Sequence, residues 1–556
     1  SVVNDDAMRN QNLTVGNVVA LVGRSTGGAP KTALRFGSPQ EARDVLGSGE
    51  LLTAVLAAFD PSSETAGPSQ VVAVRVNPAA QATLSLKNGS AADVIALTSA
   101  GYGLGENQIK VKVEAGTLKG RRLTVQRGTD YFTEDNVARD AFTVRYNGAL
   151  ASATLSITGT AVTIEAPTGT NVATIDLTQF SAIQDVVDRI NLLPDFTAQV
   201  GENNYTKPAL NGLDHITSQD VKAATYTVRA DLQAAVDWFN SARQNLVRAT
   251  RSAGAGAPPV ASPFAFLSGG SDGTTTVTDW ADAFEVLQTI DAQWITPVSG
   301  DDAIHAMADS HVAFMSNVAR KERRAIVGTD LATADDAAIQ KAKALNSDRT
   351  SLVHIGHYDY DLAGKLTLYP AYISAARIAG GFSGVNPGTP LTNKNFRCRG
   401  LERKLRNPID TDILINGGVL CLEDTEQGYK VVKSISTWLI NDNYNRVEQS
   451  CGVALDFVAR NVREALDQLR GAKGNPLVLR RAISITQGAL RELAREEPQG
   501  PGVLAGNAES PAYRNITASL EGDVLRVEFE CSPVIPVNYV LATIFAVPFS
   551  GVATAA

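Results

Sequence analysis

RNITASLEGDVLRVEFE, residues 514–530, predicts a β-hairpin near the end of the chain. Two strand-like runs flank the tight turn Glu521-Gly522-Asp523, and the second run alternates apolar with charged residues, as a strand with one buried face does. The apolar members of the second run are Leu525, Val527 and Phe529. We therefore expect an amphipathic hairpin that packs one face on a core.

The hairpin is followed, after Pro533 and Pro536, by the apolar run YVLATIFAV, residues 539–547. This run is β-branched, aromatic or small on both faces, which is typical of a strand buried on two sides. Such a strand either closes a sheet of its own chain or pairs with the sheet of another copy, and the sequence leaves both open. For pairing between copies, the strand would contribute Tyr539, Val540, Leu541, Thr543, Ile544, Phe545 and Val547, and the partner hairpin would offer Leu525, Val527 and Phe529.

Length and composition describe a folded chain of several domains. The 556 residues suggest about three to four domains, and 44% hydrophobic with 19% charged residues are ordinary for packed proteins. A formal charge of −8 and the lack of a Lys/Arg run argue against direct binding of nucleic acid. No apolar run has the length of a membrane span, and residues 1–6 lack a signal-peptide pattern, so we expect neither membrane insertion nor export.

The cysteines show no metal-binding or redox spacing. Neither C-x-x-C nor a zinc pattern occurs among them. We expect buried thiols of a protein folded in a reducing cytoplasm, with cross-links between copies as the alternative. The four residues are Cys398, Cys421, Cys451 and Cys531.

The residues that commonly carry catalysis form no recognisable site either. His354 and His357 lie three apart on a predicted strand, where their imidazoles point to opposite faces. No nucleophile elbow or metalloprotease helix occurs. We therefore predict no metal, no cofactor and no enzymatic activity.

The strand and helix patterns divide the chain into an α/β part, a β-rich insertion and an α+β part. The predicted fold class is α/β and α+β multidomain, with an α/β core, a C-terminal α+β domain, terminal strand-exchange arms and an inserted β-rich domain. The expected boundaries are 1–17 for an N-terminal arm, 18–80 for the opening α/β block, 81–205 for the insertion, 206–265 for a connecting helix and linker, 266–395 for the α/β core, 396–530 for the α+β domain and 531–556 for a C-terminal strand and tail donated to a neighbour.

Within the α+β domain, strands and one long helix are expected. Leu414-Ile415 and residues 417–422 predict strands, and the second of them pairs with residues 431–438 as a hairpin. Residues 448–470 predict a helix with one apolar stripe and mixed charges opposite.

The order of several short motifs resembles the contractile tail sheath proteins, which encase the inner tube of bacteriophage tails and related injection machines. The resemblance covers most of the chain outside the insertion, although residues 1–17 lack the proline-glycine-aromatic segment with which many such proteins begin. The motifs are the strand and loop at 18–30, LSGGSDG at 267–273, PAYISAARIAG at 370–380, INGGV at 415–419, SIST at 434–437 and PVNY at 536–539.

The resemblance implies a structural subunit. Such subunits form stacked hexameric rings, tied by exchanged terminal strands into a helical assembly, and they contract to drive the inner tube through a cell envelope during genome ejection. The implied partners are further copies of the chain, the inner tail tube protein, and baseplate and tail terminator proteins, in a virion tail assembled in the host bacterial cytoplasm. The resemblance places the inserted β-domain on the outside and the charged face of the long helix, with Arg460, Arg463 and Asp467, toward the tube.

One alternative is an α/β enzyme with a β-rich domain that grips its substrate, such as a glycan-active hydrolase. It requires convergent acid and base residues at the carboxyl ends of the parallel strands, and the sequence does not show them. A tail-tube or non-contractile shell protein is disfavoured by the length of the chain and its many predicted helices.

Overall fold

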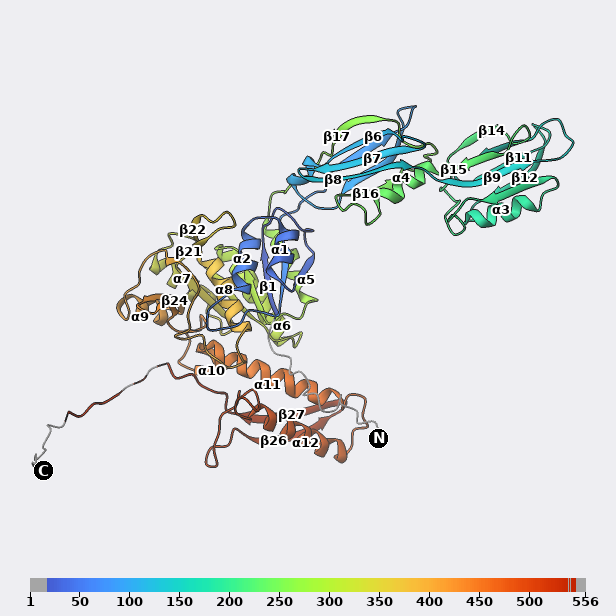
Figure 1. Cartoon of the computed structure of the whole chain (residues 1–556). Helices are drawn as coiled ribbons and strands as arrows, with labels where there is room; N and C mark the ends of the chain where they lie inside the picture. Colours follow the sequence, from blue (N-terminus) through green and yellow to red (C-terminus); the bar gives the residue numbers. More distant parts are fainter. Residues whose placement is uncertain (1–17, 539, 541, 547–556) are drawn as a thin grey trace, which may run out of the picture. The chain divides into compact units, whose positions relative to one another are not determined.

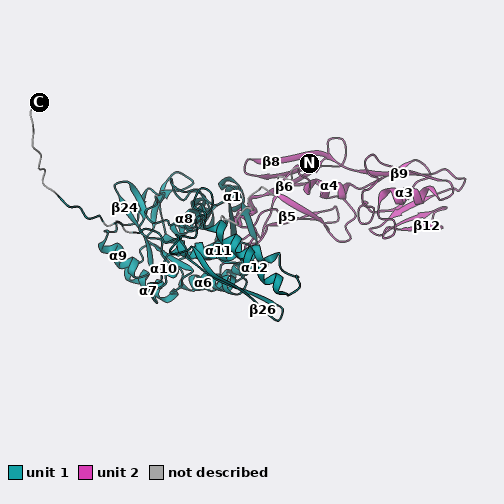
Figure 2. Cartoon of the chain, turned by 90° about the horizontal axis from the view of Figure 1, so that it is seen from below, with its two compact units in different colours: residues 1–25, 31–77, 275–556 teal, residues 26–30, 78–274 magenta. Residues whose placement is uncertain are grey.

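The computed structural model describes residues 18–538, 540 and 542–546 (Figure 1). It consists of two compact units, which Figure 2 shows in separate colours. One unit holds the residues up to 25, 31–77 and those from 275 onward. The other holds residues 26–30 and 78–274, so in sequence it is inserted into the first.

The first unit is built around one eight-stranded sheet of order β2-β3-β1-β18-β19-β20-β24-β25. Its six inner strands run parallel, and β2 and β25 pair antiparallel at the two edges. Strands from both sides of the insertion therefore share a single sheet. The strands are β1 (Val18–Gly23), β2 (Ala33–Phe36), β3 (Gln70–Arg75), β18 (Trp294–Pro297), β19 (Arg324–Gly328), β20 (Thr350–His354), β24 (Val419–Thr425) and β25 (Gly428–Val431).

Helices cover both faces of this sheet, which explains why its strands are apolar throughout. Val19 and Leu21 of β1 belong to one buried cluster, and the alternating Ala20 and Val22 belong to another. The first cluster is closed by α1 (Pro39–Leu46), α2 (Glu50–Phe59) and α8 (Ala371–Ser383). The second is closed by α5 (Val277–Gln288), α6 (Asp302–Asn317), α7 (Asp335–Leu345) and α9 (Ile409–Asn416).

Three sequence expectations change here. The hairpin partner predicted at 431–438 is β25, which ends at Val431, and residues 432–438 form no strand, because the Ser436 and Thr437 amides donate to the Val447 and Thr350 carbonyls instead. Leu414 and Ile415 lie in α9 and not in a strand. A short apolar run carries no periodicity that distinguishes the two states, and here the helix buries Leu414 against the sheet. His354 ends β20 while His357 begins β21 (His357–Tyr360), because Ile355 between them has a left-handed backbone with φ of 65°. Strand β21 pairs with β22 (Leu366–Tyr369) and β23 (Gly400–Leu401).

The C-terminal part of this unit is a helix pair packed on a hairpin. Figure 1 shows α11 (Gln449–Asp467), α12 (Pro476–Leu493) and the strands β26 (Tyr513–Glu521) and β27 (Val524–Cys531), preceded by the short α10 (Tyr444–Val447). Apolar residues of both helices, with Val503 and Leu504, form a separate buried cluster. The predicted helix and the predicted terminal hairpin are both present.

The inserted unit contains two β-rich clusters, each with one α-helix. The first has α4 (Asp231–Phe239), β4 (Thr83–Lys87), β5 (Asp93–Ser99), β6 (Lys110–Ala115), β7 (Arg121–Arg127), β8 (Asp130–Val137), β16 (Val247–Arg251), β17 (Ser262–Phe266) and the 3-10 helix Leu104–Gln108. The second has α3 (Ile183–Asn191), β9 (Asp140–Tyr146), β10 (Thr154–Ile157), β11 (Ala161–Glu165), β12 (Asn171–Asp176), β13 (Phe196–Val200), β14 (Ile216–Asp220) and β15 (Tyr226–Arg229).

Candidate assembly site at the C-terminal end

The apolar run after Pro536 forms no strand over the residues that the structure describes. Val540, Ile544 and Phe545 are 85%, 88% and 84% exposed, and Thr543 is exposed as well. Of the other predicted strand residues, Tyr539, Leu541 and Val547 lie outside the described residues. For the described part of the run, closure of a sheet within the same chain is therefore not observed.

The hairpin β26–β27 has two open edges. It is a two-stranded sheet, and over the described residues neither outer edge pairs with a third strand. Leu525, Val527 and Phe529 alternate as half-buried residues with the exposed, charged Arg526 and Glu528. A sheet of two strands is marginal by itself, so this hairpin can still gain stability from an added strand.

A groove runs between the apolar face of the hairpin and the C-terminal half of α11. Its volume is about 850 Å³. Aliphatic residues line it from both the helix and the hairpin, and charged residues also contribute to the lining. Its residues include Val462, Leu466, Leu469, Leu520, Leu525, Val527, Phe529, Arg463, Asp467 and Arg470.

The segment between the hairpin and the exposed run is held on its own subunit. We call residues 532–538 the arm root and residues 539–547 the terminal segment. The Val534 amide donates to the Val503 carbonyl at 3.1 Å, and the Cys451 thiol donates to the Val534 carbonyl at 3.3 Å. The Ser532 amide donates to the Ala512 carbonyl, and the Ser532 carbonyl accepts from the Ala505 amide. The chain therefore leaves the folded body only after these contacts.

The last of these contacts joins Asn538 to a buried carboxylate. The Nδ2 of Asn538 donates to Oε1 of Glu448 at 2.6 Å, and the Lys433 ammonium lies 3.3 Å from the same oxygen. Glu448 is fully buried immediately before α11. Burial raises the pKa of Glu448, against the lowering influence of Lys433 and of the Asn538 hydrogen bond.

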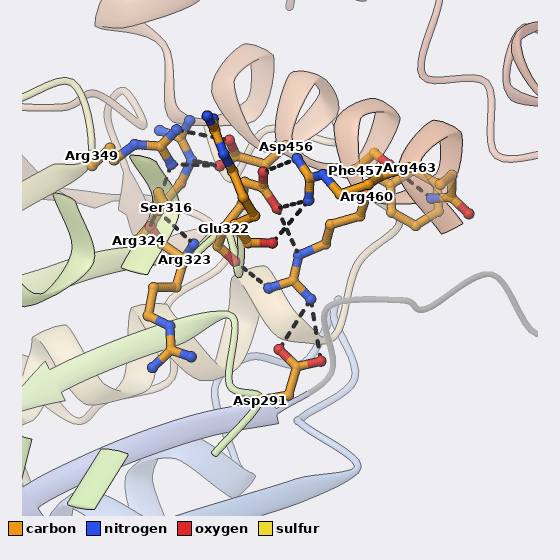
Figure 3. A network of polar contacts seen from close by, with 12 residues as sticks. Asp291, Ser316, Glu322, Arg323, Arg324, Arg349, Asp456, Phe457, Arg460 and Arg463 are labelled. Atoms are coloured by element: carbon orange, nitrogen blue, oxygen red, sulfur yellow. Dashed lines mark hydrogen bonds and ion pairs between the residues drawn. The ribbon is translucent and has the colours of Figure 1, made fainter. Parts of the chain in front are cut away.

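The charged face of α11 is bound to the end of the central sheet, as Figure 3 shows. Arg463 makes a bidentate pair with Glu322, with Nη2 to Oε1 at 2.6 Å and Nη1 to Oε2 at 3.1 Å. Arg460 reaches the same carboxylate and also pairs with Asp291 at 3.2 Å. The predicted Asp467, in contrast, is exposed and pairs only with the neighbouring Arg470 at 3.0 Å among the described residues.

A second ion cluster lies closer to the start of α11. Asp456 accepts from Arg324 at 2.8 Å and from Arg349 at 3.1 and 3.2 Å. Arg324 also donates to the Gln449 side chain at 2.9 Å. One carboxylate thus balances two largely buried guanidinium groups, and burial lowers the pKa of Arg324.

Comparisons with known proteins find similarity to phage tail sheath proteins. No family model matches the chain. A tail sheath protein of Bacillus phage SP01 is 29% identical over 570 residues, which cover 99% of this chain and 95% of the relative. The chain is a relative of phage tail sheath proteins. A putative tail sheath protein of Enterococcus phage phiEF24C is 28% identical, over 93% of this chain and 91% of the relative.

A solved tail sheath structure has the same fold. The sheath tail protein of Listeria innocua superposes with a TM-score of 0.55 at 14% identity, over 93% of this chain and 92% of that one. The expected resemblance to contractile tail sheath proteins is confirmed by these relatives. Because the sheath relatives are structural proteins, they also confirm the prediction that the chain is not an enzyme.

One group of side chains in this chain, Thr329, His354 and Asp335, resembles a catalytic triad, but its hydroxyl is not accessible to a substrate. At the carboxyl ends of β19 and β20, His354 bonds through Nδ1 to the Thr329 hydroxyl and through Nε2 to Asp335, both at 2.9 Å. Thr329 is fully buried, so no substrate can reach its hydroxyl. The contacts instead satisfy a buried polar cluster, and burial lowers the pKa of His354.

All four cysteines are free thiols. Burial raises the pKa of Cys398 and of Cys421 to about 12, and that of Cys451 to about 11. These thiols therefore stay protonated and unreactive near neutral pH. Over the described residues no three His, Cys, Asp or Glu side chains converge on a metal position, and no helix is long and apolar enough to span a membrane.

Proposed function

We propose that this chain is a subunit of a contractile tail sheath, assembled as stacked hexameric rings around an inner tube. The observation that carries the proposal is the coexistence of two complementary features in one chain. The described residues of the terminal segment are exposed and include the apolar Val540, Ile544 and Phe545. Over the described residues, the hairpin β26–β27 has unpaired edges beside a groove that aliphatic side chains line in part. A second copy can supply what each feature lacks.

Strand donation explains how copies are tied together. The terminal segment of one copy adds to the hairpin of the next, and its apolar residues meet the face that carries Leu525, Val527 and Phe529. Because the donor and acceptor surfaces are different, each subunit can give and receive one strand. Repetition of a head-to-tail contact then produces an open helical assembly. The residues before Val18 are proposed to make the corresponding N-terminal arm.

Contraction is proposed as rigid-body movement of subunits that stay joined through these arms. The ion pairs of Arg460 and Arg463 with Glu322, and of Asp456 with Arg324, support a first unit that moves as one body. The extended sheath would be kinetically trapped, and its contraction would drive the tube through a cell envelope for genome ejection. The inserted unit is proposed to lie on the outside.

The inner tail tube, the baseplate and the tail terminator are the proposed partners, within a virion tail assembled in the host cytoplasm. Arg460, Arg463 and Asp467 remain the proposed tube-facing residues. Arg460 and Arg463 already engage Glu322, so reversing their charge would disturb the fold as well as any tube contact. Asp467 and Arg470 are exposed and give the cleaner test of this surface.

Negative-stain electron microscopy tests the sheath proposal. The full chain, with and without its inner tube protein, is expected to form long hollow tubes, whereas a chain ending at Cys531 stays dispersed. I544D/F545D should also abolish tubes, because carboxylates cannot be buried in the apolar groove. L118D is the matched control, since Leu118 is 89% exposed in the inserted unit. Dispersed particles from the full chain under every condition would overturn the proposal.

A further inference from the structure

The contact between Asn538 and Glu448 joins a buried carboxylate to the point where the terminal segment begins. Glu448 is fully buried, although a buried carboxylate is costly unless it is paired. Its oxygen Oε1 has two partners, the Lys433 ammonium and the Asn538 amide. Asn538 is also the last residue of the arm root, directly before the terminal segment.

The Glu448 side of this contact belongs to a rigid part of the fold. The backbone of Glu448 forms a bridge with Ile435, and its carbonyl accepts from the Gly452 amide in the first turn of α11. The next residue, Gln449, is buried and bonds through its side chain to Arg324 and Ser351. Asn538 is therefore hydrogen-bonded to a residue, Glu448, whose backbone and neighbour Gln449 are fixed by several hydrogen bonds.

The Asn538 side belongs to a segment with few other attachments. Upstream, Val534 is held by two hydrogen bonds to the body. Between Val534 and Asn538, the side chains of Ile535 and Val537 are 56% and 81% exposed. Without the Asn538 contact, the free part of the chain would therefore begin near Val534 instead of after Asn538.

We propose that Asn538 and Glu448 form an anchor that fixes where the donated terminal segment leaves its own subunit. The proposal rests on the strand donation proposed above, and it makes both residues positioning residues for that donation. A tethered strand searches a smaller volume when its free length is short, so its effective concentration at the neighbouring hairpin is higher. Ordering the segment in advance also lowers the entropy lost on pairing.

The anchor has unused hydrogen-bonding capacity. Oε2 of Glu448 and Oδ1 of Asn538 are buried acceptors without a partner in the described part of the chain. A proton on Glu448, or a glutamine in its place, would add a hydrogen-bond donor beside these two unpaired acceptor oxygens. The charged and titratable groups that act on Glu448 are the Lys433 ammonium and, from α11, the Cys451 thiol. E448Q is therefore expected to keep the anchor and not to break it.

Hydrogen–deuterium exchange of the dispersed full chain measures the anchor directly. N538A is expected to raise the exchange of residues 532–538 about tenfold or more, as for the loss of one hydrogen bond to a charged group. E448Q should leave that exchange within about twofold of wild type. V537A is the matched control, because its side chain is exposed in the same segment. Unchanged exchange in N538A would overturn the anchor.

The rate of tube formation measures the positioning role. N538A should assemble more slowly than V537A at equal concentration, with tubes of normal diameter at the end. Faster exchange with an unaltered assembly rate would show a contact that positions nothing and would overturn the proposal. Failure of strand donation itself is recognised separately, because I544D/F545D would then assemble normally while the exchange result for N538A would be unaffected.

Discussion

The carboxylates of Glu448 and Asp456, before and within α11, differ in how many cations lie close to them. Glu448 has one ammonium near it and is fully buried, so desolvation dominates and its pKa is raised. Asp456 is shared by Arg324 and Arg349, so its single negative charge faces two positive charges. The first residue makes the fold sensitive to pH, and the second keeps two arginines inside it.

Glu448 should add a pH-dependent term to stability. Because its folded-state pKa lies above the ordinary value of 4.5, its contribution is fully present below pH 4.5 and is lost as the pH rises through the folded-state value. E448Q cannot ionise and lacks this term. In urea denaturation, the free energy of unfolding of wild type, minus that of E448Q, should therefore fall as the pH is raised above 4.5. A difference that rises with pH would contradict the assignment.

Asp456 should be critical for stability. D456N leaves two largely buried guanidinium groups without their counter-charge, and a loss of about 3–5 kcal/mol in the free energy of unfolding is expected. D467N on the same helix removes an exposed pair with Arg470 and should change stability by less than about 1 kcal/mol. Chemical denaturation of both variants makes the comparison, and equal losses would argue against it.

At the scale of elements, α8 is central to the first unit. All its residues from Ala371 to Ser383 are buried between the sheet and α2. The close approach of α2 depends on Gly380, where an added Cβ would lie 2.0 Å from the Ala58 carbonyl oxygen. The small residues of the PAYISAARIAG motif thus have a packing reason that is independent of any assembly.

Substitution of Gly380 should separate packing from helix propensity. G380A is expected to destabilise the protein by about 1–3 kcal/mol, because the backbone of α2 must move away. G488A is the matched control within α12, where an added Cβ meets nothing within 4 Å, and it should stabilise by about 0.5–1 kcal/mol. Thermal unfolding of the two variants measures the contrast. A stable G380A would mean that α2 and α8 can separate without loss.

Elements with strong periodicity were predictable from sequence, and those that depend on distant partners were not. The apolar stripe of α11 and the alternation of β27 each specify one face, so their positions agree with expectation. Leu414-Ile415 has no such pattern, and packing decided in favour of a helix. Glu448 resembles an ordinary acid at a helix start. Its partners lie 15 and 90 residues away in sequence, and no local pattern reveals them.

At the scale of the whole molecule, the inserted unit is separable by its connections. The two ends of its main segment, residues 78–274, lie side by side, because Ala80 bridges Ser271 and Gly273 closely approaches Pro78. Each unit has its own buried clusters. A short linker can therefore join the two ends of the first unit without stretching its strands.

Removal of the inserted unit should leave polymerisation intact. A chain in which a short glycine-serine linker replaces residues 78–274 is expected to fold and to form tubes of reduced outer diameter, since the proposed donor and acceptor surfaces lie in the first unit. Circular dichroism and electron microscopy measure folding and assembly. A folded variant that stays dispersed would place an essential subunit contact on the inserted unit.

The ion pairs of α11 also have a mechanical meaning. A pull on the terminal segment would enter the folded body through Asn538 and Val534 at the start of α11, and it would leave through Asp456 and Arg463 into the region of β19. Helix α12 and the tip of the hairpin lie off this line of tension. The C-terminal half of α11 also lines the proposed acceptor groove. Tension on the terminal segment of one subunit would therefore reach the surface that is proposed to hold the strand of its neighbour.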